Sequence, residues 1–195
     1  MRLFPVMLVR HAAVAVPEGV CYGRTDVALQ PGWETIASGL SVLAKGVLCR
    51  VLYTSPARRC RDMARFVAQA TGMEVRVDPR LAELDFGRWE GRKWQDIDRA
   101  ALDAWAADSA GFAPPGGESG QALSQRAQAF WQDMRARGHN ACVLSHGGPL
   151  RILSALARGA EPHLLASSMP QGFARVVMVP HHHDVQQHAC SHDSP

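Results

Sequence analysis

Apolar and polar positions along the chain form short blocks that predict strands and helices in turn. Four short apolar runs, closed by polar or turn-forming residues, have the length of buried strands, and one stretch alternates like a half-buried strand. These strands are expected at residues 3–9, 47–54, 74–77, 141–145 and 174–180. Between them, apolar residues recur at helical spacing. Helices are expected at residues 33–43, 58–70, 94–107, 121–137 and 149–157.

Strands that alternate with helices in this way indicate an α/β fold. The sheet is expected to be mostly parallel and covered by helices on both faces. No internal repeat is evident, and residues 181–195 lose the apolar pattern. We therefore expect one domain over residues 1–180 and a frayed, flexible C-terminal tail over residues 181–195.

Composition narrows the class of protein further. A chain of 195 residues suits one domain, with or without a small cap. Hydrophobic residues make up 47% and charged residues 20%, a balance that argues against intrinsic disorder. The net charge of +3 is too small to indicate a nucleic-acid or membrane partner. No apolar run approaches the roughly 20 residues that span a bilayer. We expect a small-molecule ligand, and the sequence leaves the oligomeric state open.

The cysteines favour a reduced, cytoplasmic setting. Their number is odd and no C-x-x-C spacing occurs, so neither a zinc ribbon nor a thioredoxin motif is supported. They are Cys21, Cys49, Cys60, Cys142 and Cys190. The N-terminus faintly imitates a signal peptide, but its apolar run is short and stops at Arg10-His11. We discount cleavage there, because it would remove the strongest candidate residues.

The candidate chemistry lies where three predicted strands end. In a parallel sheet, ligands bind at the carboxyl ends of the strands. Two histidines and at least two arginines follow such ends, which predicts a pocket for a dianion such as phosphate. The segments concerned are Arg10-His11, Ser55 to Arg59, and Ser145-His146. Each alone is more often structural, but their joint occurrence favours a site. Gly147 and Gly148 open a helix whose N–H groups would face the same anion.

Four motifs in this order carry a family resemblance. They are Arg10-His11, Ser55-Pro56-x-x-Arg59, Leu81-x-Glu83-x-x-Phe86-Gly87-x-Trp89-Glu90-Gly91 and Ser145-His146-Gly147-Gly148. The sequence resembles the histidine phosphatase superfamily over residues 3–179, which implies the three-layer α/β/α, phosphoglycerate-mutase-like fold. Within it, residues 19–26, 117–126 and 171–173 look like stretches of the α-ribazole-5′-phosphate phosphatases of cobalamin assembly.

The resemblance implies a role for each central residue. His11 would be the nucleophile that forms a phosphohistidine. Arg10, Arg59 and His146 would bind the phosphoryl oxygens, and Glu83 would act first as general acid and then as general base. The two arginines should also lower the pKa of His11, because like charges disfavour its cationic form. No metal and no cofactor are expected, since these residues supply the positive charge.

Weaker signals surround this set. Gly147 would bind substrate through its backbone N–H. Arg24 and Tyr22 would contact the base or ribose of the substrate, or they only shape a turn. Glu118 lines the mouth of the site or opens the next helix, and we favour the second role. Four tryptophans are expected to serve packing rather than binding. They are Trp89, Trp94, Trp105 and Trp131.

Two features depart from the family pattern. Ala12 and Ala13 stand where the family commonly has glycine and then glutamate or another polar residue, so we expect activity that is retained but weakened. The chain also has little room for the lid of the longer mutases, which favours hydrolysis over phosphoryl shuttling. The tail holds five histidines and Cys190, and we favour a flexible polar tail over a metal site. Those histidines are His181, His182, His183, His188 and His192.

Three rival functions remain. A serine hydrolase would need a G-x-S-x-G elbow, and the sequence has none. A non-catalytic binder of phosphate ligands is supported only by Ala12 and Ala13. A phosphatase of broad specificity, or one specific for sugar phosphates or nucleotides, would keep the same chemistry. The sequence favours a metal-independent phosphomonoesterase that acts through phosphohistidine, with α-ribazole 5′-phosphate as its expected substrate.

Overall fold

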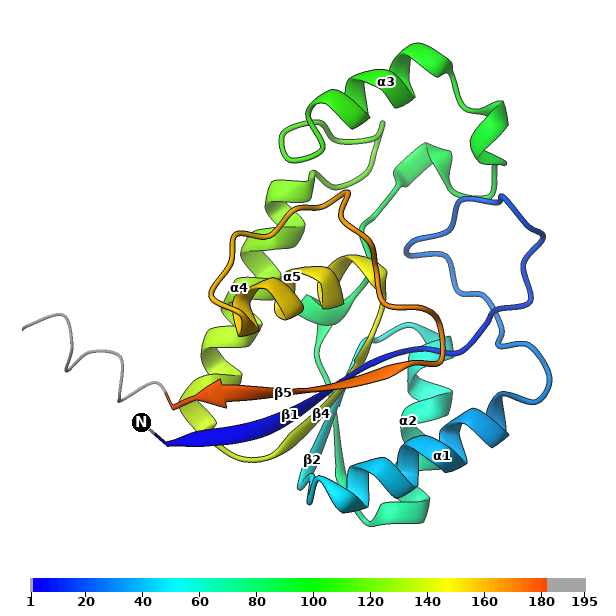
Figure 1. The fold of residues 1–195 in the computed structure, drawn as a ribbon. Coiled ribbons are helices and arrows are strands. Elements are labelled where there is room, and N and C mark those ends of the chain that lie inside the picture. The colour runs from blue at the N-terminus through cyan, green and yellow to red at the C-terminus, as the bar shows by residue number, and fades with distance from the viewer. Residues whose placement is uncertain (1, 182–195) are drawn as a thin grey trace, which may run out of the picture.

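A five-stranded sheet forms the centre of the computed structural model, which describes residues 2–181 (Figure 1). The strands are β1 (Leu3–Arg10), β2 (Val51–Thr54), β3 (Glu74–Val77), β4 (Ala141–Ser145) and β5 (Ala174–Pro180). Their order across the sheet is β3-β2-β4-β1-β5. The first four run parallel, and β5 pairs antiparallel with β1. The expected mostly parallel sheet is confirmed.

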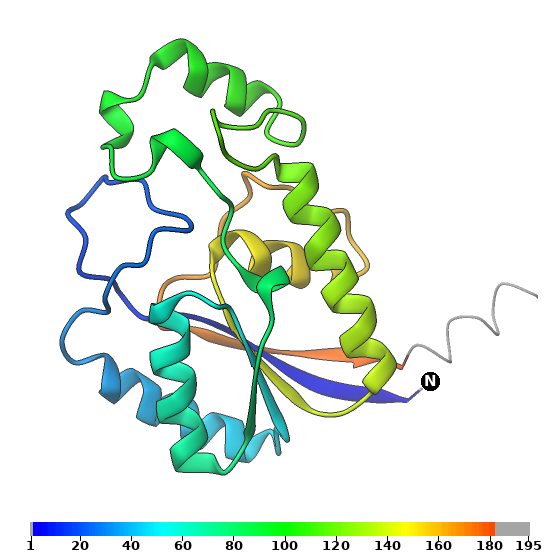
Figure 2. The same cartoon turned by 180° about the vertical axis from the view of Figure 1, so that it is seen from behind.

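Helices cover both faces of the sheet (Figures 1 and 2). The helices α1 (Trp33–Gly46) and α2 (Arg58–Thr71) lie on one face, and α4 (Gly120–Arg137) and α5 (Gly147–Ala157) on the other. Because side chains alternate along a strand, Val6 and Leu8 of β1 pack towards α4 and α5, whereas Met7 and Val9 pack towards α1 and α2. The three-layer α/β/α architecture is therefore confirmed.

Residues 86–117 form a small cap outside the three layers. It contains 3-10 turns at Gly87–Trp89 and Trp94–Asp96 and the helix α3 (Arg99–Ala107), drawn in green at the top of Figure 1. A third 3-10 turn, Pro79–Leu81, precedes it. Aromatic rings hold the cap together, with neighbouring ring centroids from 5.4 Å to 6.5 Å apart. The rings belong to Phe86, Trp89, Trp94, Trp105 and Phe112.

Two predicted elements are wrong in extent. The strand expected at residues 47–54 begins only at Val51. Val47 and Leu48 instead close the end of α1, where their N–H groups donate to the carbonyls of Leu43 and Lys45. Leu48 adopts a positive φ of 57°, which is incompatible with an extended strand.

The helix expected at residues 94–107 is broken into two pieces. Its first part is the 3-10 turn Trp94–Asp96, and α3 begins only at Arg99. The side chain of Asp98 accepts a hydrogen bond from the N–H of Ala101 and so caps the new helix. A strong N-cap residue inside an apolar periodic stretch marks this break.

Most of the C-terminal tail lies outside the part of the chain that the structure describes. Residues 182–195, which include Cys190 and four of the tail histidines, lie outside the described residues, so the expectations for the tail stay predictions. Within residues 2–181, no helix is long and apolar enough to cross a membrane.

Candidate active site

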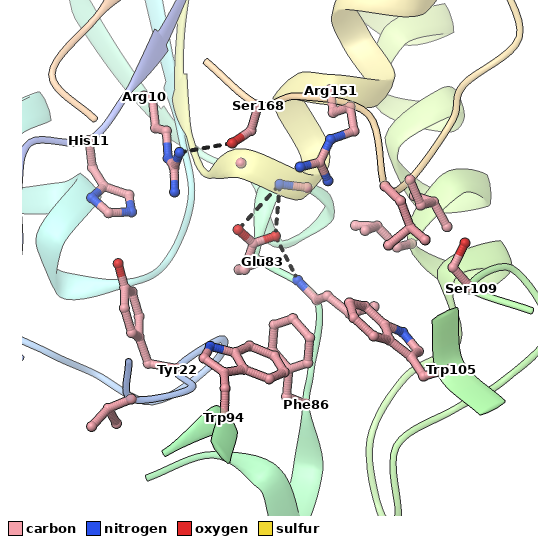
Figure 3. A pocket seen from close by; sticks show the side chains of 17 residues that line it. Arg10, His11, Tyr22, Glu83, Phe86, Trp94, Trp105, Ser109, Arg151 and Ser168 are labelled. Carbon is pink, nitrogen blue, oxygen red and sulfur yellow. Dashed lines mark hydrogen bonds between the residues drawn. The ribbon is translucent and has the colours of Figure 1, made fainter. Parts of the chain in front are cut away.

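A pocket of about 320 Å³ opens beside the end of β1 and the start of α5 (Figure 3). Arg10, His11, Glu83, Gly147 and Gly148 line one end, which we call the phosphate end. The other end, which we call the leaving-group end, is lined by apolar and aromatic side chains together with Arg151. They include Phe86, Trp94, Trp105, Leu123, Leu164 and Leu165.

His11 follows the last residue of β1 and is 1% exposed. Its backbone N–H donates to the carbonyl of Ser145 on β4, which fixes the chain at this point. The ring Nδ1 lies 2.7 Å from the carbonyl of Ala12, so the neutral ring donates there and keeps a lone pair on Nε2. Burial, and then the charges of Arg59 and Arg10, lower the pKa of His11 to about 3. The expected direction of the shift is thus present, but burial is its larger cause.

Arg10 is anchored through one of its terminal nitrogens. Nη1 donates to Ser168 Oγ at 3.1 Å and to the carbonyl of Met169 at 2.7 Å, both in the segment between α5 and β5. A side chain added at Gly147 would place its Cβ 3.5 Å from Nη2 of Arg10. Because both of these hydrogen bonds use Nη1, Nη2 can donate to an anion at this end of the pocket.

Arg59 lies fully buried behind the pocket wall. Its Nη2 donates to the carbonyl of Gly23 at 2.7 Å and to Nδ1 of His146 at 3.1 Å, and Nη1 donates to the carbonyl of Thr25. Its guanidinium carbon lies 5.4 Å from the centroid of the Tyr22 ring, which lines the pocket. The Nε–H has no partner among the described residues.

His146 also lies behind the wall rather than on it. Its Nδ1 accepts from Arg59, so Nε2–H donates to Ser55 Oγ at 2.7 Å. Burial, followed by the charge of Arg59, holds the pKa of His146 well below its usual value. Its ring centroid is 5.1 Å from that of His11. The structure therefore places His146 beside the candidate nucleophile, with both ring nitrogens engaged.

Glu83 is held at the first turn of α5. Its carboxylate accepts hydrogen bonds from the N–H of Gly148 at 3.0 Å and from the N–H of Leu84 at 3.0 Å (Figure 3). A Cβ at position 148 would lie 2.3 Å from Oε1 of Glu83, so only glycine permits this approach. The carboxylate consequently faces the pocket from a fixed position.

Arg24 does not line the pocket. Its Nε donates to the backbone carbonyl of Glu83 at 3.2 Å, and Nη2 lies 3.4 Å from Glu118. Arg126 donates to the same carbonyl at 3.0 Å and pairs with Glu118 at 2.7 Å. Arg24 and Glu118 thus support the segment that carries Glu83, and a contact of Arg24 with substrate stays a prediction.

Ala12 does not point into the pocket. It is 1% exposed and packs in the core between the sheet and α1 and α2, while its N–H lies 3.1 Å from the sulfur of Met63. Its methyl group therefore takes no space from a phosphoryl group, which removes one reason to expect weakened activity.

Sequence reasoning missed most of the leaving-group end. The sequence predicts that Trp94 and Trp105 serve packing, yet both line the pocket. Arg151, Ser109 and Ser168 also line it, and no motif points to them. The position of Arg151 one helical turn after Gly147 is a signal that could have identified it.

Within the described part of the chain, no group of three or more His, Cys, Asp or Glu side chains is placed to hold a metal ion.

Comparisons with known proteins show which family the chain resembles. The model of the "Histidine phosphatase superfamily (branch 1)" matches residues 6–190. The chain is 32% identical over 161 residues to an adenosylcobalamin/alpha-ribazole phosphatase of Escherichia coli, covering 80% of this chain and 78% of the relative. It is 30% identical over 172 residues to a glucosyl-3-phosphoglycerate phosphatase of Mycolicibacterium vanbaalenii, covering 82% and 76%.

Comparison of the fold with solved structures also finds an alpha-ribazole phosphatase. The crystal structure of the alpha-ribazole phosphatase from Shigella flexneri superposes with a TM-score of 0.80 at 27% sequence identity, covering 89% of each chain. Some relatives are longer than this chain. The match spans only 46% of a bifunctional protein from Mycobacterium tuberculosis. The names of these relatives give different substrates for a shared scaffold.

Proposed function

Because the chain belongs to the histidine phosphatase superfamily, branch 1, and is a phosphomonoester hydrolase of that type, we propose that His11 is its nucleophile. The observation that carries this proposal is the state of the His11 ring. The ring is neutral over the physiological range because its pKa is lowered to about 3. Its Nδ1–H is committed to the carbonyl of Ala12, so the lone pair of Nε2 is free to attack phosphorus.

The reaction then proceeds in two displacements. Nε2 of His11 forms a bond to phosphorus as the bond between phosphorus and the ester oxygen breaks, and Glu83 donates a proton to the departing oxygen. Water next attacks phosphorus, Glu83 takes a proton from that water, and the N–P bond breaks. Inorganic phosphate leaves, and His11 and Glu83 return to their starting states.

Positive charge at the phosphate end stabilises both transition states. Arg10 would donate from Nη2, since its hydrogen bonds to the protein use Nη1. Arg59 would donate to a phosphoryl oxygen from Nε, which has no partner in the described chain. Gly147 adds the positive end of α5. His146 holds Arg59 in position and binds a phosphoryl oxygen directly when that oxygen replaces Ser55 Oγ. These groups supply the charge that a metal would otherwise provide.

The proposed substrate is α-ribazole 5′-phosphate, which would place the enzyme in cobalamin biosynthesis. Two observations support it: the similarity to alpha-ribazole phosphatases and the aromatic leaving-group end of the pocket. Phe86, Trp94 and Trp105 present ring surfaces on which a planar base would stack. A sugar phosphate would make less use of these rings.

Phosphate release from α-ribazole 5′-phosphate tests both the proposed phosphatase activity and the proposed substrate. It is compared with release from ribose 5-phosphate, glycerol 3-phosphate and p-nitrophenyl phosphate, with a chelator present throughout. We expect release from all four and the highest kcat/KM for α-ribazole 5′-phosphate. Equal kcat/KM values would keep the phosphatase and reject the substrate. Binding without release from any ester would instead support a non-catalytic phosphate binder.

A further inference from the structure

The side of α1 that faces away from the sheet carries apolar side chains. Val42 and Leu43 are 71% and 52% exposed, while the opposite side of the helix is buried in the core. The neighbouring helix α2 covers the same face of the sheet, but its exposed side carries ion pairs between Asp62 and two arginines. A helix that is apolar on all sides is typical of a buried position. The composition of α1 is therefore that of a helix covered on both sides.

The apolar surface continues from α1 onto β5, which forms an edge of the sheet beside it (Figure 1). Side chains alternate along a strand, so Val176 and Met178 lie on the same face as Ala174, which packs in the core beneath α1. An open hollow between the two elements makes the surface continuous. We call it the α1–β5 face. Its large apolar side chains, which are between 38% and 71% exposed, are Ile36, Val42, Leu43, Phe173, Val176 and Met178.

Two glycines on the exposed side of α1 are not required by the packing of the described chain. Gly39 lies in the middle of the helix and Gly46 at its end, and neither has a positive φ. A Cβ added at either position would meet nothing within 4 Å. Glycine is among the poorest helix formers, so a residue with a side chain would suit α1 better if the helix stood alone. The space above each glycine is a shallow hole that admits a side chain from outside.

These holes match side chains of the same helix. Thr35 and Val42 are seven residues apart, as are Gly39 and Gly46, and the four follow one another at intervals of four, three and four. Residues at this spacing form the seam of a coiled coil. In an antiparallel pair of α1 helices, Val42 of one copy would meet Gly39 of the other, and Thr35 would meet Gly46. A two-fold axis forms each of these contacts twice, so α1 is complementary to a second copy of itself.

The charges of α1 fit the same arrangement. Its two charged residues are Glu34 in the first turn and Lys45 in the last turn, and neither makes an ion pair within residues 2–181. They are eleven residues apart, which is about three turns, so they share one side of the helix. Antiparallel helices bring Glu34 of each copy towards Lys45 of the other, whereas parallel helices would bring like charges together. The charges therefore favour the antiparallel pair.

We propose that the enzyme is a homodimer in which the α1–β5 faces of two copies pack together, with their α1 helices antiparallel about a two-fold axis. The exposed apolar side chains of this face offer on the order of 500 Å², close to the apolar share of the roughly 800 Å² that each partner buries in a standard interface. Neither α1 nor β5 lines the pocket, so the dimer and the proposed hydrolysis can fail independently.

The oligomeric state in solution tests the pairing. Sedimentation velocity over a series of protein concentrations gives the mass of the wild-type protein and its dissociation constant, and we expect the mass of two chains. Gly39→Leu fills a hole and also raises helix propensity, so the single chain should fold at least as well. We expect its dissociation constant to rise about 100-fold, because the new side chain overpacks the seam. A wild-type protein that stays monomeric at the highest concentration reached would overturn the proposal.

Matched variants distinguish this face from other surfaces. Val42→Asp should dissociate the dimer, since it places a charge in the seam. Val77→Asp should not, because Val77 is exposed on β3, at the opposite edge of the sheet. The kcat per chain should keep the wild-type value in both variants, since neither residue lines the pocket. A dimer that survives Val42→Asp, or one that Val77→Asp dissociates, would show that a different surface forms the contact.

Exchanged charges test the direction of the helices. Glu34→Lys and Lys45→Glu should each raise the dissociation constant about tenfold, because each places like charges opposite one another twice in the dimer. The double variant should return to the wild-type value. Single variants that associate as tightly as the wild-type protein, or a double variant no tighter than the single ones, would reject the antiparallel pair.

Discussion

The two ends of the pocket are built in different ways. At the phosphate end, Arg10 and His11 end a central strand, His146 directly follows β4 and directly precedes α5, and backbone hydrogen bonds hold the positions of these elements. At the leaving-group end, Trp94 and Trp105 come from the cap, and Leu164 and Leu165 come from the connection between α5 and β5. The ends of central strands thus carry the proposed catalytic residues, whereas connecting segments line the leaving-group end.

The largest expected effect comes from removing the nucleophile at the phosphate end. His11→Ala should lower kcat by roughly 10⁴-fold or more on every ester, because no other histidine of residues 2–181 lines the pocket. Steady-state phosphate release measures this, with His163→Ala as a control at an exposed position. A kcat within about tenfold of the wild-type value would show that His11 is not the nucleophile.

Glu83→Gln should have the next largest effect, and the effect should depend on the leaving group. The amide oxygen can still accept from Gly148 N–H, but it cannot donate the proton. We expect kcat to fall by about 10²–10⁴-fold on glycerol 3-phosphate. The loss on p-nitrophenyl phosphate should be much smaller, since its leaving group needs no proton. Equal losses on both esters would contradict the role as general acid.

Gly148→Ala tests whether the start of α5 fixes the position of the Glu83 carboxylate. The new Cβ would meet Oε1 of Glu83 at 2.3 Å, so the carboxylate must move. We expect a loss of about 100-fold in kcat, since a small misplacement of a catalytic group has costs of this order. Gly39→Ala is the control, because nothing lies within 4 Å of its added Cβ. Similar kcat values for the two variants would show that Glu83 tolerates displacement.

The burial of His11 also predicts a pH dependence of stability. The pKa of His11 is about 3 in the folded protein and 6.5 in the unfolded chain, so the unfolded chain binds more protons between these values. The free energy of unfolding therefore falls as the pH falls through this window. His11→Gln should remove about 2 kcal/mol of the change between about pH 5 and pH 6.5, as measured by urea unfolding. An unchanged slope would argue that His11 is solvated.

The smallest expected effect lies at the leaving-group end. Trp94→Leu should raise the KM for α-ribazole 5′-phosphate about tenfold through lost stacking, and leave glycerol 3-phosphate unaffected. Trp33→Leu, on α1 and outside the pocket lining, serves as the control. A KM that rises equally for both esters would show that Trp94 supports the pocket as a whole rather than the base.

The same contrast explains what the sequence could predict. Strand ends are local features, so Arg10-His11 and Ser145-His146 could be recognised by their position after apolar runs, and the four motifs placed them in a family. The leaving-group end depends on how the cap folds back over the sheet. The N-cap at Asp98 breaks the expected helix, and Trp94 and Trp105 then stack with ring centroids 6.2 Å apart. The periodicity of the sequence does not predict that arrangement of the two rings.

The extent of β2 shows a second limit of local patterns. Val47 and Leu48 are as apolar as a strand requires, but the helix before them uses both residues to complete its last turn. Tertiary context then leaves Leu48 exposed. Boundaries of this kind are decided by hydrogen bonds that the apolar pattern does not contain.

Trapping the phosphoenzyme during turnover would identify the residue that attacks phosphorus. The enzyme is mixed with radiolabelled substrate and quenched in alkali within one turnover, and the labelled peptide is mapped by mass spectrometry. We expect a label that is stable in alkali and labile in acid, located on His11 and absent from His11→Ala. Turnover without any such label, or a label on a different residue, would contradict it.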